Sequence, residues 1–333
     1  MSPRSMAPAK ADARVVDNSI LAAVAKCDTY AYVRYALGLN TREENLAMGA
    51  GSSIHLGMKA WLDGQGVEDA VEVVSKDYEK RVQQHLRLIE RTRLSADDKR
   101  FEPEWIEAVF HQYLTRNEGK WPFKVVKMMT EKPISAPMDL AVPSGKPVLY
   151  VARLDAIVRK WEAGGKWLMD HKTTKKASDW WIDKEKVSSQ FTGQLWLARN
   201  GAVDFEPEGV VLNVMEIPDP HKSDKICPTH KISYQECSVR HAGGTYTFVT
   251  RHDAEMRGWY LTAAKLIRRY DQLCEKADEQ GIEGIGSVQM QGRFSKECTF
   301  CDQKEWCRLG RNTSRAAIRS TFVENRWDPL KED

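Results

Sequence analysis

The 333-residue sequence has little that would tie it to a membrane or to export. It contains no apolar run of roughly 18 residues, the length that marks a membrane-spanning helix. The opening segment MSPRSMAPAKADARVVD lacks the apolar centre of a secretory signal, and we interpret residues 1–16 as a flexible tail. We therefore expect a cytoplasmic protein without a membrane partner.

Three other absences narrow the class of protein. The net charge is only +3, too weak to indicate a nucleic-acid partner by itself. The sequence has no internal repeat, and it has no G-x-x-x-x-G-K-[ST] motif, which excludes a P-loop motor. With 42% hydrophobic and 29% charged residues, the composition is that of a globular protein with a sizeable core. Seven cysteines in a chain of this kind favour metal binding over disulfides.

Hydrophobic periodicity predicts a helical block, a cluster of strands, and then further helices and strands. Helices are expected at 17–40, 49–64, 67–118, 188–199 and 253–280. Strands are expected at about 122–142, 147–158, 166–172, 209–217 and in TYTFVTRH, and residues 218–245 are expected to be rich in loops. This order indicates a mixed α/β domain with a helical insertion.

The most informative segments are VARLD, which ends at Asp155, and MDHKTTKK, which contains Asp170, His171 and Lys172. The intervening Gly164-Gly165 predicts a hairpin that brings the two acidic residues side by side. Neighbouring carboxylates are costly unless a cation lies between them, which suggests Mg²⁺ or Mn²⁺. Lys172 lies two residues after Asp170 and hence on the same strand face. The alternative is a surface hairpin with an ordinary ion pair.

Two cysteine-rich segments are candidate metal sites. CTFCDQKEWC places Cys298, Cys301 and Cys307 within ten residues, and Cys27 is the natural fourth ligand. Four sulfur ligands suit Zn²⁺ or an iron–sulfur cluster, and the one-plus-three arrangement favours [4Fe–4S].

The second segment, CPTHKISYQECSVRH, has spacings compatible with a small zinc site. Its four candidate ligands are Cys227, His230, Cys237 and His241. A surface loop with scattered polar residues is the alternative. Cys274 is interpreted as a core residue on a helix.

Six segments carry a family resemblance: CDTYAYVRYALGL, GSSIHLGMKAWL, VARLD, MDHKTTKK, SSQFTGQLWLA and CTFCDQKEWC. In this order they resemble the PD-(D/E)XK nuclease superfamily, and most closely its RecB-like branch with an iron–sulfur cluster. That branch includes the AddB nuclease domain and the CRISPR-associated adaptation exonucleases. The resemblance implies a restriction-endonuclease-like core, in which a mixed central sheet is flanked by helices, with an N-terminal helical region and a C-terminal cysteine cluster.

The resemblance also implies a single nuclease domain over residues 17–333. Within it, residues 17–120 would form the helical region and 121–217 the catalytic core. Residues 218–245 would form the loop with the candidate zinc site, and 246–333 the C-terminal helix and the cysteine segment.

The matching residues would take the following roles. The metal, Mg²⁺ or Mn²⁺, would be bound by His55, Asp155, Asp170 and the backbone carbonyl of His171. Lys172 would position the attacking water and stabilise the phosphate, while Gln190 would orient the lysine or the DNA backbone. A structural [4Fe–4S] cluster would be held by Cys27, Cys298, Cys301 and Cys307.

The sequence departs from the family pattern at two places. Ala152 stands three residues before Asp155, where the family often has glycine. The family's glutamine is often followed four residues later by tyrosine, but here Gln190 is followed by Gln194, and either glutamine fits the motif. Glu131 is a candidate accessory acid, with a solvated residue at a strand edge as the alternative.

The function implied is a metal-dependent deoxyribonuclease, an exonuclease that processes single-stranded DNA ends in bacterial or phage recombination, repair or replication. Unwinding would come from a partner such as a helicase or recombination protein, and some relatives form rings. Two alternatives come from other classes: a non-catalytic DNA-binding module with the same fold, and an adaptor in which both cysteine groups bind Zn²⁺.

Overall fold

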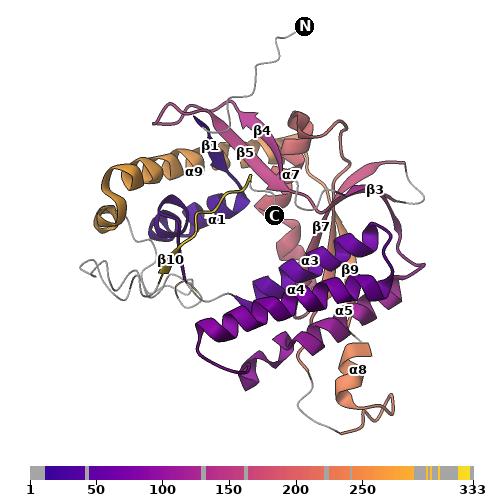
Figure 1. Ribbon diagram of the computed structural model, residues 1–333. Coiled ribbons are helices and arrows are strands. Elements are labelled where there is room, and N and C mark those ends of the chain that lie inside the picture. The colour runs from indigo at the N-terminus through magenta and orange to yellow at the C-terminus, as the bar shows by residue number, and fades with distance from the viewer. Residues whose placement is uncertain are drawn as a thin grey trace.

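The computed structural model describes residues 12–41, 45–128, 133–160, 164–220, 225–240, 242–288, 298, 301, 307 and 322–330. These residues form a mixed α/β fold, as the sequence predicts (Figure 1). No helix in these ranges is both long enough and apolar enough to cross a membrane.

The central sheet has five strands in the order β3-β6-β7-β8-β9. Their bounds are Phe123–Met128, Ala156–Lys160, Lys166–Thr174, Val210–Glu216 and Gly244–Val249. β7 and β8 run parallel, while the other neighbours run antiparallel. A parallel pair needs a crossover connection, and here it contains the helices α6 (Asp179–Lys186) and α7 (Ser189–Leu197). The sheet is therefore mixed.

A second sheet has the order β1-β5-β4, with strands Arg14–Val16, Val148–Arg153 and Pro133–Met138. The prediction of one strand over 147–158 is wrong, because the chain passes from β5 into β6 of the central sheet at Leu154 and Asp155. The backbone N–H of Asp155 donates to the Met169 carbonyl of β7 at 3.3 Å. The change of sheet therefore places Asp155 beside β7.

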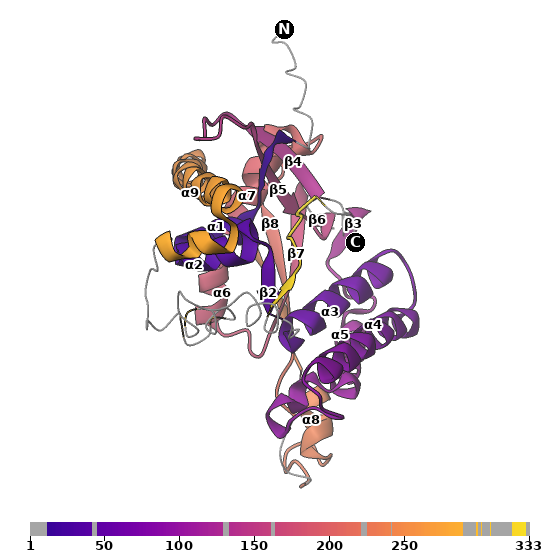
Figure 2. The same ribbon diagram turned by 60° about the vertical axis from the view of Figure 1, so that its left-hand side comes forward.

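Helices cover both faces of the central sheet (Figure 2). One face packs on α1 (Asn18–Lys26), α7 and α9 (Asp253–Gln280), and the helices α3 (Leu46–Leu62), α4 (Val67–Leu88) and α5 (Pro103–Asn117) lie on the other side. Successive side chains of β7 point to these two faces in turn. Leu168 belongs to the core around α7 and α9, and Met169 belongs to the cluster on the opposite face. Each large buried apolar side chain contributes about 1.5–3 kcal/mol.

Close packing of α3 on its neighbours depends on a glycine. A Cβ atom at Gly57 would lie 2.3 Å from Val74 and 2.7 Å from Phe110, so a larger residue would push α3 away from α4 and α5. The helix that carries His55 is thus held at a fixed distance from the rest of the helical block.

Two predicted helices are interrupted. The single helix predicted over 67–118 is wrong: α4 ends at Leu88, a 3₁₀-helix covers Ala96–Phe101, and α5 begins at Pro103. Glu90 has a positive φ of 54°, which ends α4, and Pro103 occupies the first turn of α5, where its missing N–H costs nothing.

The single helix predicted over 17–40 is also wrong. Cys27 has extended backbone angles, and it separates α1 from α2 (Asp28–Ala31), which a π-helix (Tyr32–Ala36) continues. α6 and α8 (Tyr234–Arg240) were not predicted, because neither has a buried residue and thus neither carries a hydrophobic period.

Segments from the two ends of the sequence lie side by side. β10 (Phe322–Glu324) pairs antiparallel with β2 (Leu39–Thr41), as Figure 2 shows. The indole N–H of Trp327 donates to Asp17 at 2.9 Å, and the amide of Asn40 donates to the Asn325 carbonyl at 2.6 Å. The end of the described chain is thereby fixed to the helical region near its beginning.

Candidate active site and metal-ligating groups

Asp155 joins three elements at the junction between the two sheets. Its Oδ2 accepts a hydrogen bond from the backbone N–H of His171 on β7 at 2.6 Å. Its Oδ1 lies 3.1 Å from Nδ1 of His55, which α3 carries. Burial would raise the pKa of this carboxyl, but the neighbouring His55 outweighs burial and holds it well below its usual range. Asp155 is therefore an anion at neutral pH.

Asp170, on β7, is held by the helix α7. Its Oδ1 accepts hydrogen bonds from Gln190 Nε2 at 2.8 Å and from Gln194 Nε2 at 3.1 Å. Its Oδ2 lies 2.8 Å from the ammonium of Lys172. Lys172 and Asp170 thus lie on the same strand face, and both glutamines reach Asp170.

Gln190 alone bridges the acid and the lysine, because its Oε1 also accepts a hydrogen bond from Lys172 Nζ at 3.1 Å. Gln194 is buried, with 1% of its surface exposed. The helix comes this close because Gly193 faces Tyr150, whose hydroxyl would lie 2.2 Å from a Cβ atom there.

The charge state of Lys172 decides what it can do. Burial lowers the pKa of its ammonium, but Asp170 and Asp155 outweigh burial and raise it. With its pKa raised, Lys172 is protonated at neutral pH and can act as a fixed positive charge and hydrogen-bond donor.

A buried hydrogen-bond chain supports His171 from the opposite side. The Tyr113 hydroxyl of α5 donates to Asn213 Oδ1 on β8 at 2.9 Å. Asn213 Nδ2 lies 2.9 Å from His171 Nδ1, and the parallel register pairs these two residues. With this amide orientation His171 accepts at Nδ1 and carries its proton on Nε2. Burial lowers its pKa from 6.5 to about 4, so it is neutral.

Sequence reasoning missed Asn213 and Tyr113. The signal for Asn213 is a polar residue within the otherwise apolar strand VVLNVME, since a buried amide needs partners. Nothing in the sequence identifies Tyr113 as its partner, because the two residues are 100 positions apart.

The donor set fits a hard divalent cation. Asp170 Oδ2 is buried, and the Lys172 ammonium lies 2.8 Å from it. Asp155 Oδ1 faces a histidine nitrogen at the same junction. Carboxylate oxygens suit Mg²⁺ or Mn²⁺, and a cation would offset two buried negative charges.

The four cysteines of the predicted cluster lie in two parts of the chain. Cys27 is half-buried between α1 and α2, and the Cys301 N–H donates to the Cys298 carbonyl at 3.3 Å. Cys307 is also half-buried, and the seven cysteines, all described, form no disulfide. Glu131 and His241 lie outside the described residues.

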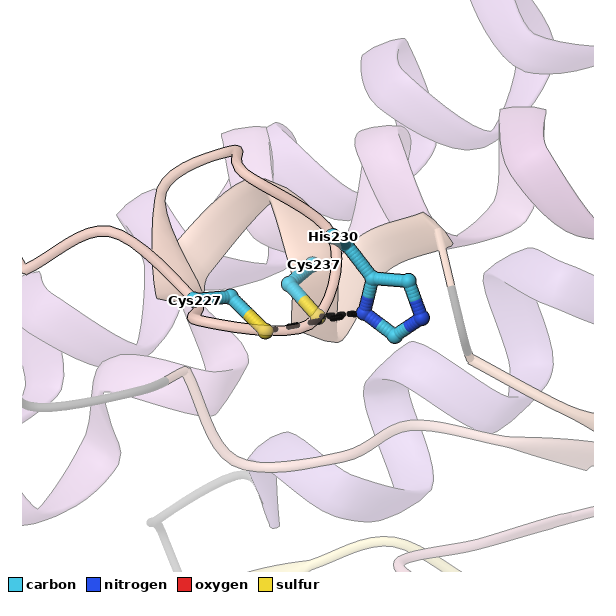
Figure 3. Close-up of side chains that lie close together, drawn as sticks. All are labelled: Cys227, His230 and Cys237. Atoms are coloured by element: carbon cyan, nitrogen blue, oxygen red, sulfur yellow. Dashed lines mark hydrogen bonds between the residues drawn. The ribbon is translucent and has the colours of Figure 1, made fainter.

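Cys227, His230 and Cys237 converge, as Figure 3 shows. Nδ1 of His230 lies 3.5 Å from Cys227 Sγ and 3.2 Å from Cys237 Sγ. Within the described ranges this is the one group of three or more Cys, His, Asp or Glu residues whose ligand atoms all lie within 4.8 Å of one another. Hydrogen bonds from the backbone N–H of His230 lower the pKa of Cys227 to about 7, whereas burial raises that of Cys237.

The fold and the buried carboxylates with their lysine define a mixed α/β protein of the kind that uses a divalent metal. The family model of the PD-(D/E)XK nuclease superfamily matches residues 18–308, and the chain belongs to this superfamily. Members of the superfamily are generally nucleases that use divalent metals. No curated protein is similar enough to count as a match.

Among solved structures, one titled "Crystal structure of SSO0001" is 15% identical. The similarity covers 70% of this chain and 79% of that chain, with a TM-score of 0.31. At that score it carries no argument about this chain.

Proposed function

We propose that the protein is a metal-dependent deoxyribonuclease that acts on DNA ends as an exonuclease. The observation that supports this most is the convergence of Asp155, Asp170 and Lys172 where the chain passes from β5 to β6 and meets β7. A surface hairpin would leave these groups solvated, but Asp155 is 9% exposed and Asp170 is 4% exposed. Burying two carboxylates this deeply is costly even with hydrogen-bond partners, and such buried charged groups are concentrated at functional sites.

Mg²⁺ or Mn²⁺ would be held by His55, Asp155 and Asp170, with the backbone carbonyl of His171. When bound, the metal supplies Lewis-acid polarisation of a phosphate oxygen and an acidified water. Lys172, fixed between Asp170 and Gln190, offsets the negative charge that grows on the phosphate. Gln190 and Gln194 fix the Asp170 carboxylate, and the chain from Tyr113 through Asn213 fixes His171.

The choice of DNA and of ends rests on the resemblance to the RecB-like branch. The branch mostly processes ends in recombination, repair or replication, and we propose single-stranded DNA ends as the substrate and the cytoplasm as the setting. A helicase or recombination protein would supply unwinding, because the sequence has no P-loop motif.

The proposal includes a structural [4Fe–4S] cluster held by Cys27, Cys298, Cys301 and Cys307. Cys27 has extended backbone angles at a break between two helices, which turns it out of the helical pattern. The pairing of β10 with β2 fixes the segment after the C-terminal cysteines beside the segment after Cys27. Thiolates of such a cluster bind different iron atoms, so they lie further apart than ligands of one zinc ion.

Cleavage of end-labelled single- and double-stranded DNA tests the nuclease. The wild type with Mn²⁺ or Mg²⁺ should cut, and Asp170→Asn should lower the rate by about a thousandfold. Asp278→Asn, which removes the same charge from an exposed site on α9, is the matched control and should cut normally. The fragments from each label give the polarity.

No cutting by folded, metal-supplied wild type would refute the proposal and favour a non-catalytic DNA-binding module. Equal cutting by Asp170→Asn would refute the assigned site. The cluster is tested separately: anaerobically purified protein should be brown and contain about four iron atoms per chain. Zinc without iron would overturn that part of the proposal.

A further inference from the structure

The connection between β8 and β9 contains a small substructure with almost no core of its own. Residues 225–240 form a turn, one isolated bridge between Ile226 and Ser233, and the seven-residue helix α8. α8 has no buried residue, and Cys227 is the one buried residue of the whole segment. A helix this short is unstable without tertiary support. Within this segment Val239 packs against the core around α3, α4 and α5, so the apolar support is small.

The local backbone brings three ligand types together. The Cys227 N–H donates to the Ile232 carbonyl at 2.7 Å, and the Lys231 N–H donates back to the Cys227 carbonyl at 2.9 Å, which closes a tight turn. Lys231 has a positive φ of 58°, an unusual conformation for a residue other than glycine. The turn presents Cys227 and His230, and α8 presents Cys237 to the same point (Figure 3).

The distances are those of a tetrahedral metal site. With Zn–S near 2.3 Å and Zn–N near 2.0–2.1 Å, a tetrahedron puts the nitrogen about 3.5 Å from each sulfur. The separations from His230 Nδ1 are 3.5 Å to Cys227 Sγ and 3.2 Å to Cys237 Sγ. A histidine nitrogen offers either one lone pair or one hydrogen, so it makes one good hydrogen bond. A shared cation explains why both sulfur atoms approach the same nitrogen.

The ligand types indicate which cation would bind. Two sulfur ligands and an imidazole suit Zn²⁺ and exclude a preference for the hard cations Mg²⁺ and Mn²⁺. This site is therefore chemically distinct from the carboxylate site at β7.

We propose that Cys227, His230 and Cys237 bind one Zn²⁺ ion, which is structural and holds the turn and α8 together. The proposal does not depend on nuclease activity. The ion also fixes the position of the segment on α5, where Arg116 donates to the carbonyls of Arg240 and Ala242. Without the ion, residues 225–240 would lose their structure while the central sheet stays folded.

Zinc content of the full-length protein, purified without added metal or chelator, tests the proposal. The wild type should contain about one more zinc ion per chain than Cys237→Ser or His230→Ala. Ser238→Ala, at the next position of α8, is the matched control and should keep the zinc of the wild type. Comparing variants separates this site from the other cysteines, because those remain in every variant.

Cobalt gives a second readout of the ligands. Co²⁺ bound to the zinc-depleted wild type should show the sulfur-to-cobalt charge-transfer absorption of a thiolate site, and Cys237→Ser should reduce it. Equal zinc content in wild type and Cys237→Ser, or a disulfide between Cys227 and Cys237 found by mass spectrometry of unreduced protein, would overturn the proposal.

Limited trypsin digestion tests the same proposal on the wild type alone, so it does not depend on how well a variant folds. A zinc-selective chelator should make the wild type susceptible at Lys231 and Arg240, and restored Zn²⁺ should protect both sites. Cleavage at these sites that does not change with chelation would overturn the structural role.

Discussion

The two candidate metal sites differ in what holds their ligands in place. The carboxylate site lies on β7, α3 and α7, between cores on both faces of the sheet, so packing positions Asp155 and Asp170 before any ion binds. The cysteine site lies on a turn, in which Cys227 is buried, and on the short helix α8, which has no buried residue. In the first region, packing of the fold positions the ligands. In the second region, metal binding by the ligands must stabilise the local structure.

Removal of metal by a chelator should have the largest effect, and the effect should differ between the two regions. Excess EDTA should abolish DNA cleavage completely and expose residues 225–240 to hydrogen exchange, while β7 and α3 stay protected. Adding Mg²⁺ in excess over the chelator should restore cleavage and not the protection, because EDTA binds zinc far more tightly than magnesium. Hydrogen exchange read by mass spectrometry measures the difference. Loss of protection spread over β7 would contradict the comparison.

Replacing the lysine should disable the packed site without unfolding it. Lys172→Met should lower the rate of DNA cleavage by about a thousandfold, because it removes the charge that offsets the phosphate. Lys175→Met, three residues on, removes only an exposed pair with Asp219 and should change the rate little. Single-turnover cleavage rates and thermal unfolding of both variants give the comparison. A Lys172→Met protein that cuts like the wild type would refute the role of Lys172.

Weakening the support of His171 should give an intermediate effect. Asn213→Ala leaves the Tyr113 hydroxyl and the His171 ring without their buried partner, which should cost about 2–4 kcal/mol of unfolding free energy. Loss of such support around a metal site typically lowers metal affinity or activity by about 10- to 100-fold. Tyr113→Phe removes one hydrogen bond and should cost about 1 kcal/mol.

Denaturant titrations and the Mn²⁺ dependence of cleavage check this prediction. A merely structural role would reduce stability and leave the Mn²⁺ concentration for half-maximal activity unchanged. That outcome would separate Asn213 from the metal site.

The sequence predicts the hairpin that carries Asp155 and Asp170 because the signals for it are local. Alternation of apolar residues identifies β6 and β7, and the two glycines between them indicate the hairpin that pairs Ala156 with Met169. The change of sheet at Asp155 and the break of helix at Cys27 depend on contacts distant in sequence, so no local pattern indicates them. The convergence of Cys227 and Cys237 likewise depends on a short helix without a hydrophobic period.

The last prediction concerns how the free energy of unfolding depends on pH. Burial lowers the pKa of His171 to about 4, so in metal-free protein the unfolded chain takes up a proton near 6.5 and the folded chain only near 4. The contribution of His171 to the free energy of unfolding is therefore complete above pH 6.5. It is lost as the pH falls toward 4, and the loss is up to about 3 kcal/mol.

Asp155 raises the pKa of His55 against the effect of burial. His55 therefore stabilises the folded protein more at low pH, which is opposite to the effect of His171. The contribution of His171 is obtained by comparing the wild type with a variant that lacks it. The free energy of unfolding of the wild type should fall by about 2 kcal/mol more than that of His171→Gln between pH 6.5 and 4.5. Denaturant titrations in a metal-free buffer measure it. Parallel curves for the two proteins would mean that His171 titrates in the folded protein as it does in the unfolded chain, and that the buried partner Asn213 does not hold it neutral.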